Sequence, residues 1–162
     1  MYDGRELTIV VVDDDEVDVR SITRSLRKRG IDNPIAVAGN GLEALDLLRG
    51  IGVRPAAWPY VVLLDINMPG MNGIEFLETI RADLNLRSTV VFVLTTSDDQ
   101  RDMLAAYENQ VAGYIVKTDA GKDFIEVVSM LEQFSLTVRF PDPHGPLTDL
   151  DSWSADVSPA PY

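Results

Sequence analysis

The sequence predicts an α/β fold: a flavodoxin-like, doubly wound sheet of five parallel strands in the order 2-1-3-4-5, with helices on both faces. Five short apolar runs alternate with five segments whose apolar residues recur at helical spacing. The runs do not alternate polar with apolar positions, as expected of strands that are covered on both faces. Right-handed crossovers favour this strand order, although the pattern is compatible with other orders.

Residues 7–12 are predicted to form the first strand, because they make a continuous run of apolar and β-branched side chains. The run ends in three consecutive acids, Asp13, Asp14 and Asp15. Apolar residues then recur at helical spacing, with Asp15 placed to cap the helix and Gly30 to end it. Helix capping is the purely structural interpretation of these acids, and we expect it to hold for Asp15.

The second strand is expected at residues 34–38 and is short. Asn40 and Glu43 follow it with the spacing of a capping box, which predicts a helix that continues to Gly50. Prolines in residues 50–59 mark that segment as a connection.

The third strand, residues 60–64, is the element around which a site is expected to form. It is almost wholly apolar and ends at Asp65, after which turn-forming residues carry the backbone away. In an open parallel sheet this position faces the ligand crevice. Because an ionised acid beside buried strands needs a partner, Asp65 is either a functional group or a turn-forming acid.

Two further helices are predicted from capping-box spacing followed by apolar residues at helical intervals. The first begins at Asn72 with Glu75, and its apolar face is expected to reach Leu84. The second begins at Ser97 with Gln100.

The last two strands also end in polar side chains. Residues 90–94 precede Thr95, and residues 113–116 precede Lys117. A final helix is expected from about residue 120 to residue 135, where apolar residues again recur at helical spacing.

Composition narrows the class of partner and the location. The chain has 26 acidic and 14 basic residues, a formal net charge of -12, so we expect no nucleic-acid partner and regard a cation as the more natural small ligand. The absence of cysteine excludes disulfides and thiolate metal sites. No apolar run approaches the roughly 18 residues of a membrane span, and the acidic start lacks a secretory signal. We therefore expect no membrane association and a cytoplasmic location.

Four of the five predicted strands end in an acid, a hydroxyl or an amine. In the predicted order the first and third strands flank the switch point, so Asp13 and Asp14 should lie beside Asp65. Thr95 and Lys117 should approach from the neighbouring strands. Taken singly, Thr95 could equally be a strand-end hydroxyl without a functional role, and Lys117 a solvated side chain at a strand end. Taken together, the five side chains predict one site.

Three carboxylates in one place require compensation. Two like charges about 4 Å apart repel by about 4 kcal/mol at an effective dielectric constant near 20. Lys117 supplies one positive charge, and a divalent cation would supply two more. Mg²⁺ suits carboxylate oxygens, whereas no histidine or cysteine near these strands suggests zinc. A carboxylate beside Mg²⁺, a lysine and a hydroxyl is suited to accept a phosphoryl group.

The order and spacing of these residues resemble the receiver domain of two-component response regulators, the CheY-like family. The resemblance covers about residues 5–135 and depends on four motifs: Val11-Val12-Asp13-Asp14, residues 64–73, Val93-Leu94-Thr95 and residues 113–117. It implies that Asp65 is the phosphoacceptor. It also implies that Asp13 and Asp14 hold Mg²⁺ directly or through water, and that the backbone carbonyl of Asn67 completes the protein ligands.

The same resemblance assigns roles to the remaining residues. Thr95 would bind a phosphoryl oxygen, Tyr114 would change rotamer with it, and Lys117 would pair with the phosphate. The chain would then be a signalling protein rather than an enzyme. It would accept a phosphoryl group from a sensor histidine kinase, lose it slowly and act on an unknown target through protein contacts.

Two alternatives remain at this point. Thr118 stands where the family usually has a proline in a cis peptide, so Lys117 would be placed differently in a pseudo-receiver that binds partners without phosphorylation. A phosphatase with an aspartate nucleophile is less favoured, because Asn67 stands where that class has a second acid.

The run Thr95-Thr96-Ser97, the residue Thr118 and a final helix that leads into a proline-containing extension are similar to the small regulators of bacterial phytochromes. This similarity implies a bacteriophytochrome as the kinase and a homodimer. We expect a receiver domain at residues 1–135 and an extension at residues 136–162, with no separate output domain. Disorder of the extension and its docking on this or a second subunit both remain open.

Overall fold

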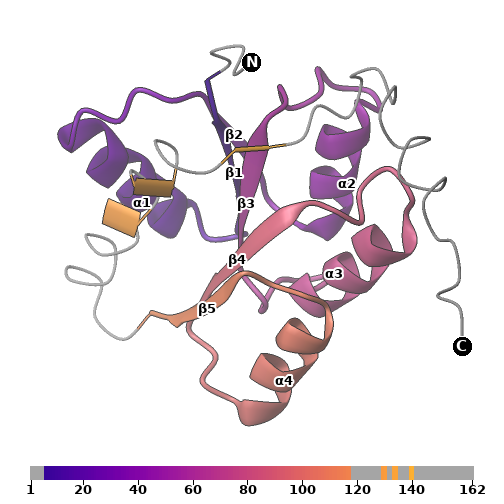
Figure 1. Cartoon of the computed structure of the whole chain (residues 1–162). Helices are drawn as coiled ribbons and strands as arrows, with labels where there is room; N and C mark the ends of the chain where they lie inside the picture. The colour runs from indigo at the N-terminus through magenta and orange to yellow at the C-terminus, as the bar shows by residue number, and fades with distance from the viewer. Residues whose placement is uncertain (1–5, 118–128, 131–132, 135–138, 141–162) are drawn as a thin grey trace, which may run out of the picture.

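The computed structural model, which describes residues 6–117, 129–130, 133–134 and 139–140, confirms the flavodoxin-like doubly wound fold (Figure 1). Its parallel strands are hydrogen-bonded in the order β2-β1-β3-β4-β5. The strands are β1 (Thr8–Val12), β2 (Ile35–Ala38), β3 (Tyr60–Leu64), β4 (Val90–Thr95) and β5 (Gly113–Val116). The helices between them are α1 (Glu16–Lys28), α2 (Gly41–Arg49), α3 (Gly73–Ala82) and α4 (Gln100–Glu108).

The central strand β1 is covered on both faces. Its alternate residues belong to two hydrophobic clusters: Ile9 and Val11 pack with α1, while Val10 and Val12 pack in the cluster that contains α2 and α3. Figure 1 shows α1 on one side of the sheet and α2 and α3 on the other. Because neither face of β1 meets solvent, this strand reads as a continuous apolar run.

Three predicted helix caps are confirmed. The side chains of Asp15, Asn40 and Asn72 each accept a hydrogen bond of 2.9 Å from a backbone N–H in the first turn of the helix that follows. These bonds satisfy donors that a helix start otherwise leaves free.

Two local predictions are wrong. Asp99, not Ser97, caps α4, because the Ser97 hydroxyl instead donates to the Asp102 carboxylate at 2.6 Å. Leu84 does not extend the apolar face of α3, because the helix ends at Ala82 and the next residue is extended. Leu84 is consequently 78% exposed.

The predicted final helix and the extension lie mostly outside the described residues, which include helical residues at 129–130 and 133–134. The described part joins a row of edge-to-face aromatic contacts, with ring centroids 5.1 to 5.8 Å apart. We call this row the aromatic chain, and its members in order of contact are Tyr60, Trp58, Phe140, Phe134 and Phe92. It connects the amino-terminal end of β3 to the middle of β4.

Candidate functional site

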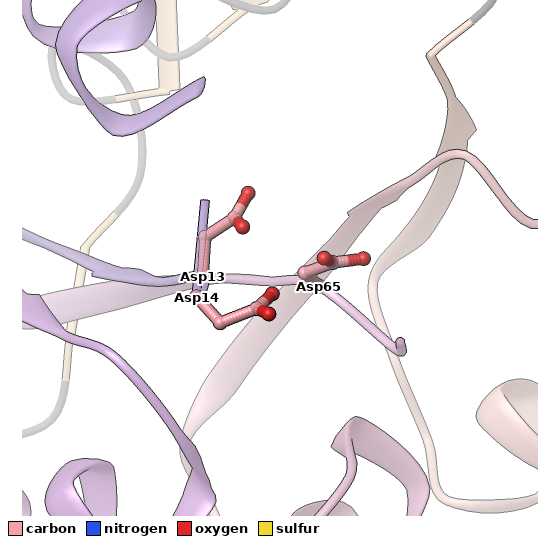
Figure 2. Close-up of side chains that lie close together, drawn as sticks. All are labelled: Asp13, Asp14 and Asp65. Carbon is pink, nitrogen blue, oxygen red and sulfur yellow. The ribbon is translucent and has the colours of Figure 1, made fainter. Parts of the chain in front are cut away.

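The carboxylates of Asp13, Asp14 and Asp65 converge at the carboxyl-terminal end of β1 and β3 (Figure 2). One oxygen from each side chain lies within 4.8 Å of the other two. Asp13 and Asp65 are buried, with 5% and 8% exposure, while Asp14 is exposed. The strand register explains the convergence, because the last residues of β1 and β3 are paired.

Backbone hydrogen bonds fix the two buried acids. The Asp13 N–H donates to the carbonyl of Ala38 at 3.1 Å, and the Asp65 N–H donates to that of Val12 at 2.9 Å. Their side chains also accept hydrogen bonds from the backbone: Asp13 Oδ1 accepts one of 2.9 Å from the Asp15 N–H, and Asp65 Oδ1 accepts one of 3.4 Å from the Asn67 N–H. The predicted role of the Asn67 carbonyl stays a prediction.

Gly73 lets α3 begin directly against the turn that carries Asp65. Its N–H donates to the carbonyl of Ile66 at 2.9 Å. A Cβ atom at this position would overlap the Asp65 carbonyl oxygen and lie 2.8 Å from the Ile66 Cα. Only glycine permits this approach, so the position of Asp65 depends on it.

Lys117 reaches the site from β5, as predicted, but its direct partners are unexpected. Its Nζ donates to Asp13 Oδ2 at 2.9 Å and to Asp18 Oδ2 at 2.7 Å. The Lys117 side chain is only 9% exposed. No local signal in the sequence links Asp18 to the site, because its partner Lys117 lies 99 residues away.

Burial and ion pairing act against each other at this contact. Burial raises the pKa of the Asp13 carboxyl above its usual value, although the Asp15 N–H and Lys117 oppose this change. For Lys117, burial alone would lower the pKa, but the hydrogen bonds to Asp18 and Asp13 raise it above its usual value. The lysine is therefore held as a charged ammonium in a largely desolvated position.

Thr95 lies at the end of β4 and is fully buried. Its Oγ1 accepts a hydrogen bond of 3.3 Å from the N–H of Ser97, and the Ser97 carbonyl accepts one of 2.9 Å from the Tyr114 hydroxyl. Burial raises the pKa of Tyr114. Ser97 thus links the two residues that the resemblance pairs. Its predicted place as a helix cap did not indicate this role.

The donor set fits a hard divalent cation. Three carboxylates supply oxygen ligands from two adjacent strand ends, and the exposed Asp14 leaves the group open to solvent. Oxygen ligands with room for water suit Mg²⁺ or Mn²⁺ rather than zinc. The like charges of the three carboxylates also favour a bound cation.

Comparison with known proteins gives consistent matches. Residues 9–129 match the family described as the response regulator receiver domain. Response regulator Rcp1 from Synechocystis sp. is 34% identical over 135 residues, which cover 82% of this chain and 92% of Rcp1. The probable methanogenesis regulatory protein FilR2 from Methanothrix harundinacea is 32% identical, with coverage of 79% and 83%.

Solved structures give the same result. The Mn(2+)-bound form of Rcp1 has a TM-score of 0.73 at 31% identity, covering 85% of this chain and 100% of that chain. The phosphorylated cyanobacterial phytochrome response regulator RcpA has a TM-score of 0.72 at 29% identity, with the same coverage. The bacteriophytochrome response regulator AtBRR has a TM-score of 0.66 at 30% identity, covering 86% and 100%.

Proposed function

The chain belongs to the response regulator receiver domain family of two-component systems, and from this premise we propose that it accepts a phosphoryl group on Asp65 from a sensor histidine kinase. The observation that carries the proposal is the convergence of three carboxylates within 4.8 Å at the sheet end that also presents Thr95 and a buried Lys117. Because this whole constellation is in place, phosphorylation is favoured over a pseudo-receiver. Thr118, which motivated that alternative, lies outside the described residues.

In the proposed reaction an Asp65 carboxylate oxygen attacks the phosphorus of a phosphohistidine. The new O–P bond forms as the N–P bond breaks, and the departing imidazole nitrogen keeps the electron pair. The Lys117 ammonium offsets charge on the transferring oxygens, and the Thr95 hydroxyl donates a hydrogen bond to one of them. The same groups then hold the aspartyl phosphate. The chain loses this phosphoryl group slowly and acts on no other substrate, so we propose that it is not an enzyme.

We assign the cation of this reaction, Mg²⁺, to the carboxylates of Asp13, Asp14 and Asp65 with the backbone carbonyl of Asn67. Mg²⁺, when bound, supplies charge neutralisation for the carboxylates and the phosphoryl oxygens. The similar protein Rcp1 has a Mn(2+)-bound form, which supports the binding of a divalent cation by this chain. The chain's own contribution is to fix the acids on two adjacent strand ends.

The test of phosphorylation uses the purified full chain with Mg²⁺ and a small acyl phosphate, followed by intact mass. We expect the mass of one phosphoryl group to appear with Mg²⁺ and to be absent when the metal is chelated. If no mass is gained under either condition, the pseudo-receiver becomes the better description.

The proposed response to phosphorylation runs through Thr95, Ser97 and Tyr114. A phosphoryl oxygen would draw the Thr95 hydroxyl away from the Ser97 N–H, and the loop that moves also holds the Tyr114 hydroxyl. Movement of this loop would change the surface formed by α4 and β5. Thr95→Ala should therefore uncouple phosphorylation from partner binding, and an unchanged phosphorylation-dependent affinity would argue against this route.

We further propose a bacteriophytochrome as the kinase, because the chain is similar to the phytochrome response regulators RcpA and AtBRR. The downstream target would be another protein, with no nucleic-acid or membrane partner. None of the helices in the described part of the chain has the length and apolar character of a membrane span. The location we propose is cytoplasmic. Light-dependent phosphotransfer from a purified bacteriophytochrome to this chain, absent in Asp65→Asn, tests the pairing.

The domain division is a proposal as well: a receiver at residues 1–135 and an extension at residues 136–162 that contributes to a homodimer. Phe140 of the extension contacts Trp58 and Phe134, which supports docking near the amino-terminal end of the sheet. Light scattering of the full chain against a chain that ends at Ser135 tests this. A dimer for both would show that the extension does not hold the subunits together.

A further inference from the structure

Asp18 contacts the site, yet the proposed phosphoryl transfer gives it no role. It lies in the first turn of α1, and its Oδ2 atom is 2.7 Å from Lys117 Nζ, closer than the 2.9 Å between Lys117 and Asp13. The Asp18 side chain is 26% exposed and the Lys117 side chain 9%. This pair is mostly removed from solvent, unlike the exposed surface pairs that contribute little.

The Asp13 carboxylate is needed by two cationic groups. Its Oδ1 atom accepts from the Asp15 N–H and its Oδ2 atom from Lys117, so a cation that binds Asp13 meets an oxygen that already holds an ammonium. A divalent cation bound to the same carboxylate repels the Lys117 ammonium and weakens its hold on Asp13. If Asp13 were its only acceptor, the largely buried ammonium would then be left unpaired, which is strongly disfavoured.

Local contacts hold Asp18 in a fixed place relative to the site. Asp15 caps α1 by accepting from the Val17 N–H, and the Asp15 N–H in turn donates to Asp13. The start of α1 is therefore tied to the acid that the cation and the lysine share. Asp18 lies three residues after the cap, on the side that faces Lys117.

We propose that Asp18 is a positioning residue, a second acceptor that retains the Lys117 ammonium at the site when a divalent cation takes the Asp13 oxygen. The inference rests on the proposed function only for the place of the cation. With Asp18 present, the lysine gives up one of two acceptors and keeps the other. Without it, the lysine stays on Asp13 and competes with the cation.

A general electrostatic effect is the competing explanation, since any nearby acid attracts a cation. Glu16 provides the matched control, because it lies in the same turn of α1 and carries the same charge. Its side chain is 87% exposed and pairs with Arg20 at 3.7 Å, away from Lys117. Removing Glu16 therefore measures the loss of one acid without disturbing the lysine.

The experiment measures Mg²⁺ affinity by calorimetry on the purified, unphosphorylated full chain. Coupling between contacting residues predicts that Asp18→Asn weakens affinity about threefold to tenfold, and Glu16→Gln by less than about twofold. Asp18→Glu, which restores a carboxylate, should recover most of the loss. Circular dichroism of each variant checks that it is folded.

The decisive comparison repeats Asp18→Asn in a Lys117→Met background. If Asp18 acts by holding the lysine, its substitution should cost at least about threefold less in that background. Equal losses in both backgrounds, or no loss in either, would overturn the proposal, as would a parent chain that does not bind Mg²⁺. Phosphorylation by acyl phosphate is read separately, so a chain that shows the coupling but gains no phosphoryl mass would refute the proposed function and leave this inference standing.

Discussion

The two ends of the sheet present opposite kinds of side chain. At the carboxyl-terminal end, three acids lie within 4.8 Å of one another, and one of them, Asp13, binds a lysine that also binds Asp18. At the amino-terminal end, the aromatic chain begins with Tyr60 and Trp58, which belong to or pack on one hydrophobic cluster, and ends with Phe92 in the other. The aromatic chain therefore connects the two clusters, from the amino-terminal end of β3 to the middle of β4.

This difference shows where the molecule gains stability and where it sacrifices it for function. Each edge-to-face aromatic pair contributes about 0.5 to 1.5 kcal/mol of stability beyond its buried area, and the rings carry no charge that needs a partner. The carboxylates instead repel one another and must be fixed by backbone hydrogen bonds and one ammonium. We expect substitutions at the amino-terminal end to change stability and those at the carboxyl-terminal end to change binding and chemistry.

The largest expected effect is that of Asp65→Asn at the carboxyl-terminal end. The amide has nearly the same shape but is not a nucleophile, so the variant should fold and gain no phosphoryl mass from acyl phosphate. Intact mass and a urea unfolding curve measure the two properties. Phosphorylation of the variant to the same stoichiometry as the parent would exclude Asp65 as the acceptor.

Phe92→Ala at the aromatic chain should have the largest effect on stability. Phe92 is 7% exposed and contacts Phe134 at 5.5 Å, and truncation of a buried phenylalanine typically costs about 3 to 5 kcal/mol. Urea unfolding measures this loss, with Leu104→Ala, at a residue that is 61% exposed, as the control that should stay within about 0.5 kcal/mol. Mg²⁺ affinity of the folded variant should not change. A large loss of affinity would mean that the aromatic chain and the carboxylate site are coupled.

Asp14→Ala should change metal binding and stability in opposite directions. Loss of a carboxylate ligand should weaken Mg²⁺ affinity by about tenfold or more. Relief of the repulsion between carboxylates should raise stability in metal-free buffer. This gain should be only about 1 kcal/mol, because Asp14 is exposed and water screens its charge. Calorimetry and urea unfolding with a chelator measure the two changes. Glu16→Ala controls for the loss of one charge. If Mg²⁺ binds Asp14→Ala as tightly as the parent, Asp14 is not a ligand.

The smallest of the four effects is expected from the pH dependence of Tyr60. Burial raises the pKa of Tyr60 above its ordinary value of 10.0, although a hydrogen bond with Thr89 opposes this. The unfolded chain therefore ionises first, so this contribution to stability is complete below about pH 10 and is lost as the pH rises through the folded pKa. The parent should lose more stability than Tyr60→Phe between about pH 9 and pH 11. If the free energy of unfolding of the two proteins fell equally over this pH range, the prediction would be contradicted.

Local sequence determined much of the fold. The strands are apolar runs because helices cover both faces, and each strand was located to within a residue or so of its bounds. The caps Asp15, Asn40 and Asn72 were predictable because each bonds to a backbone N–H two or three residues away. The convergence of Asp13, Asp14 and Asp65 also followed, because parallel strands in this order bring the same ends together.

Tertiary structure alone decided which groups those side chains bind. Lys117 could be placed at the site from its strand, but its acceptors Asp13 and Asp18 lie 104 and 99 residues away in the chain. Arg81 likewise donates to carbonyls of two loops, at Thr89 and Asn109 among others. A sequence pattern reports the period and the ends of an element. The partner of a long side chain depends instead on the few ångströms that separate packed elements, and those distances exist only once the sheet and its helices have assembled.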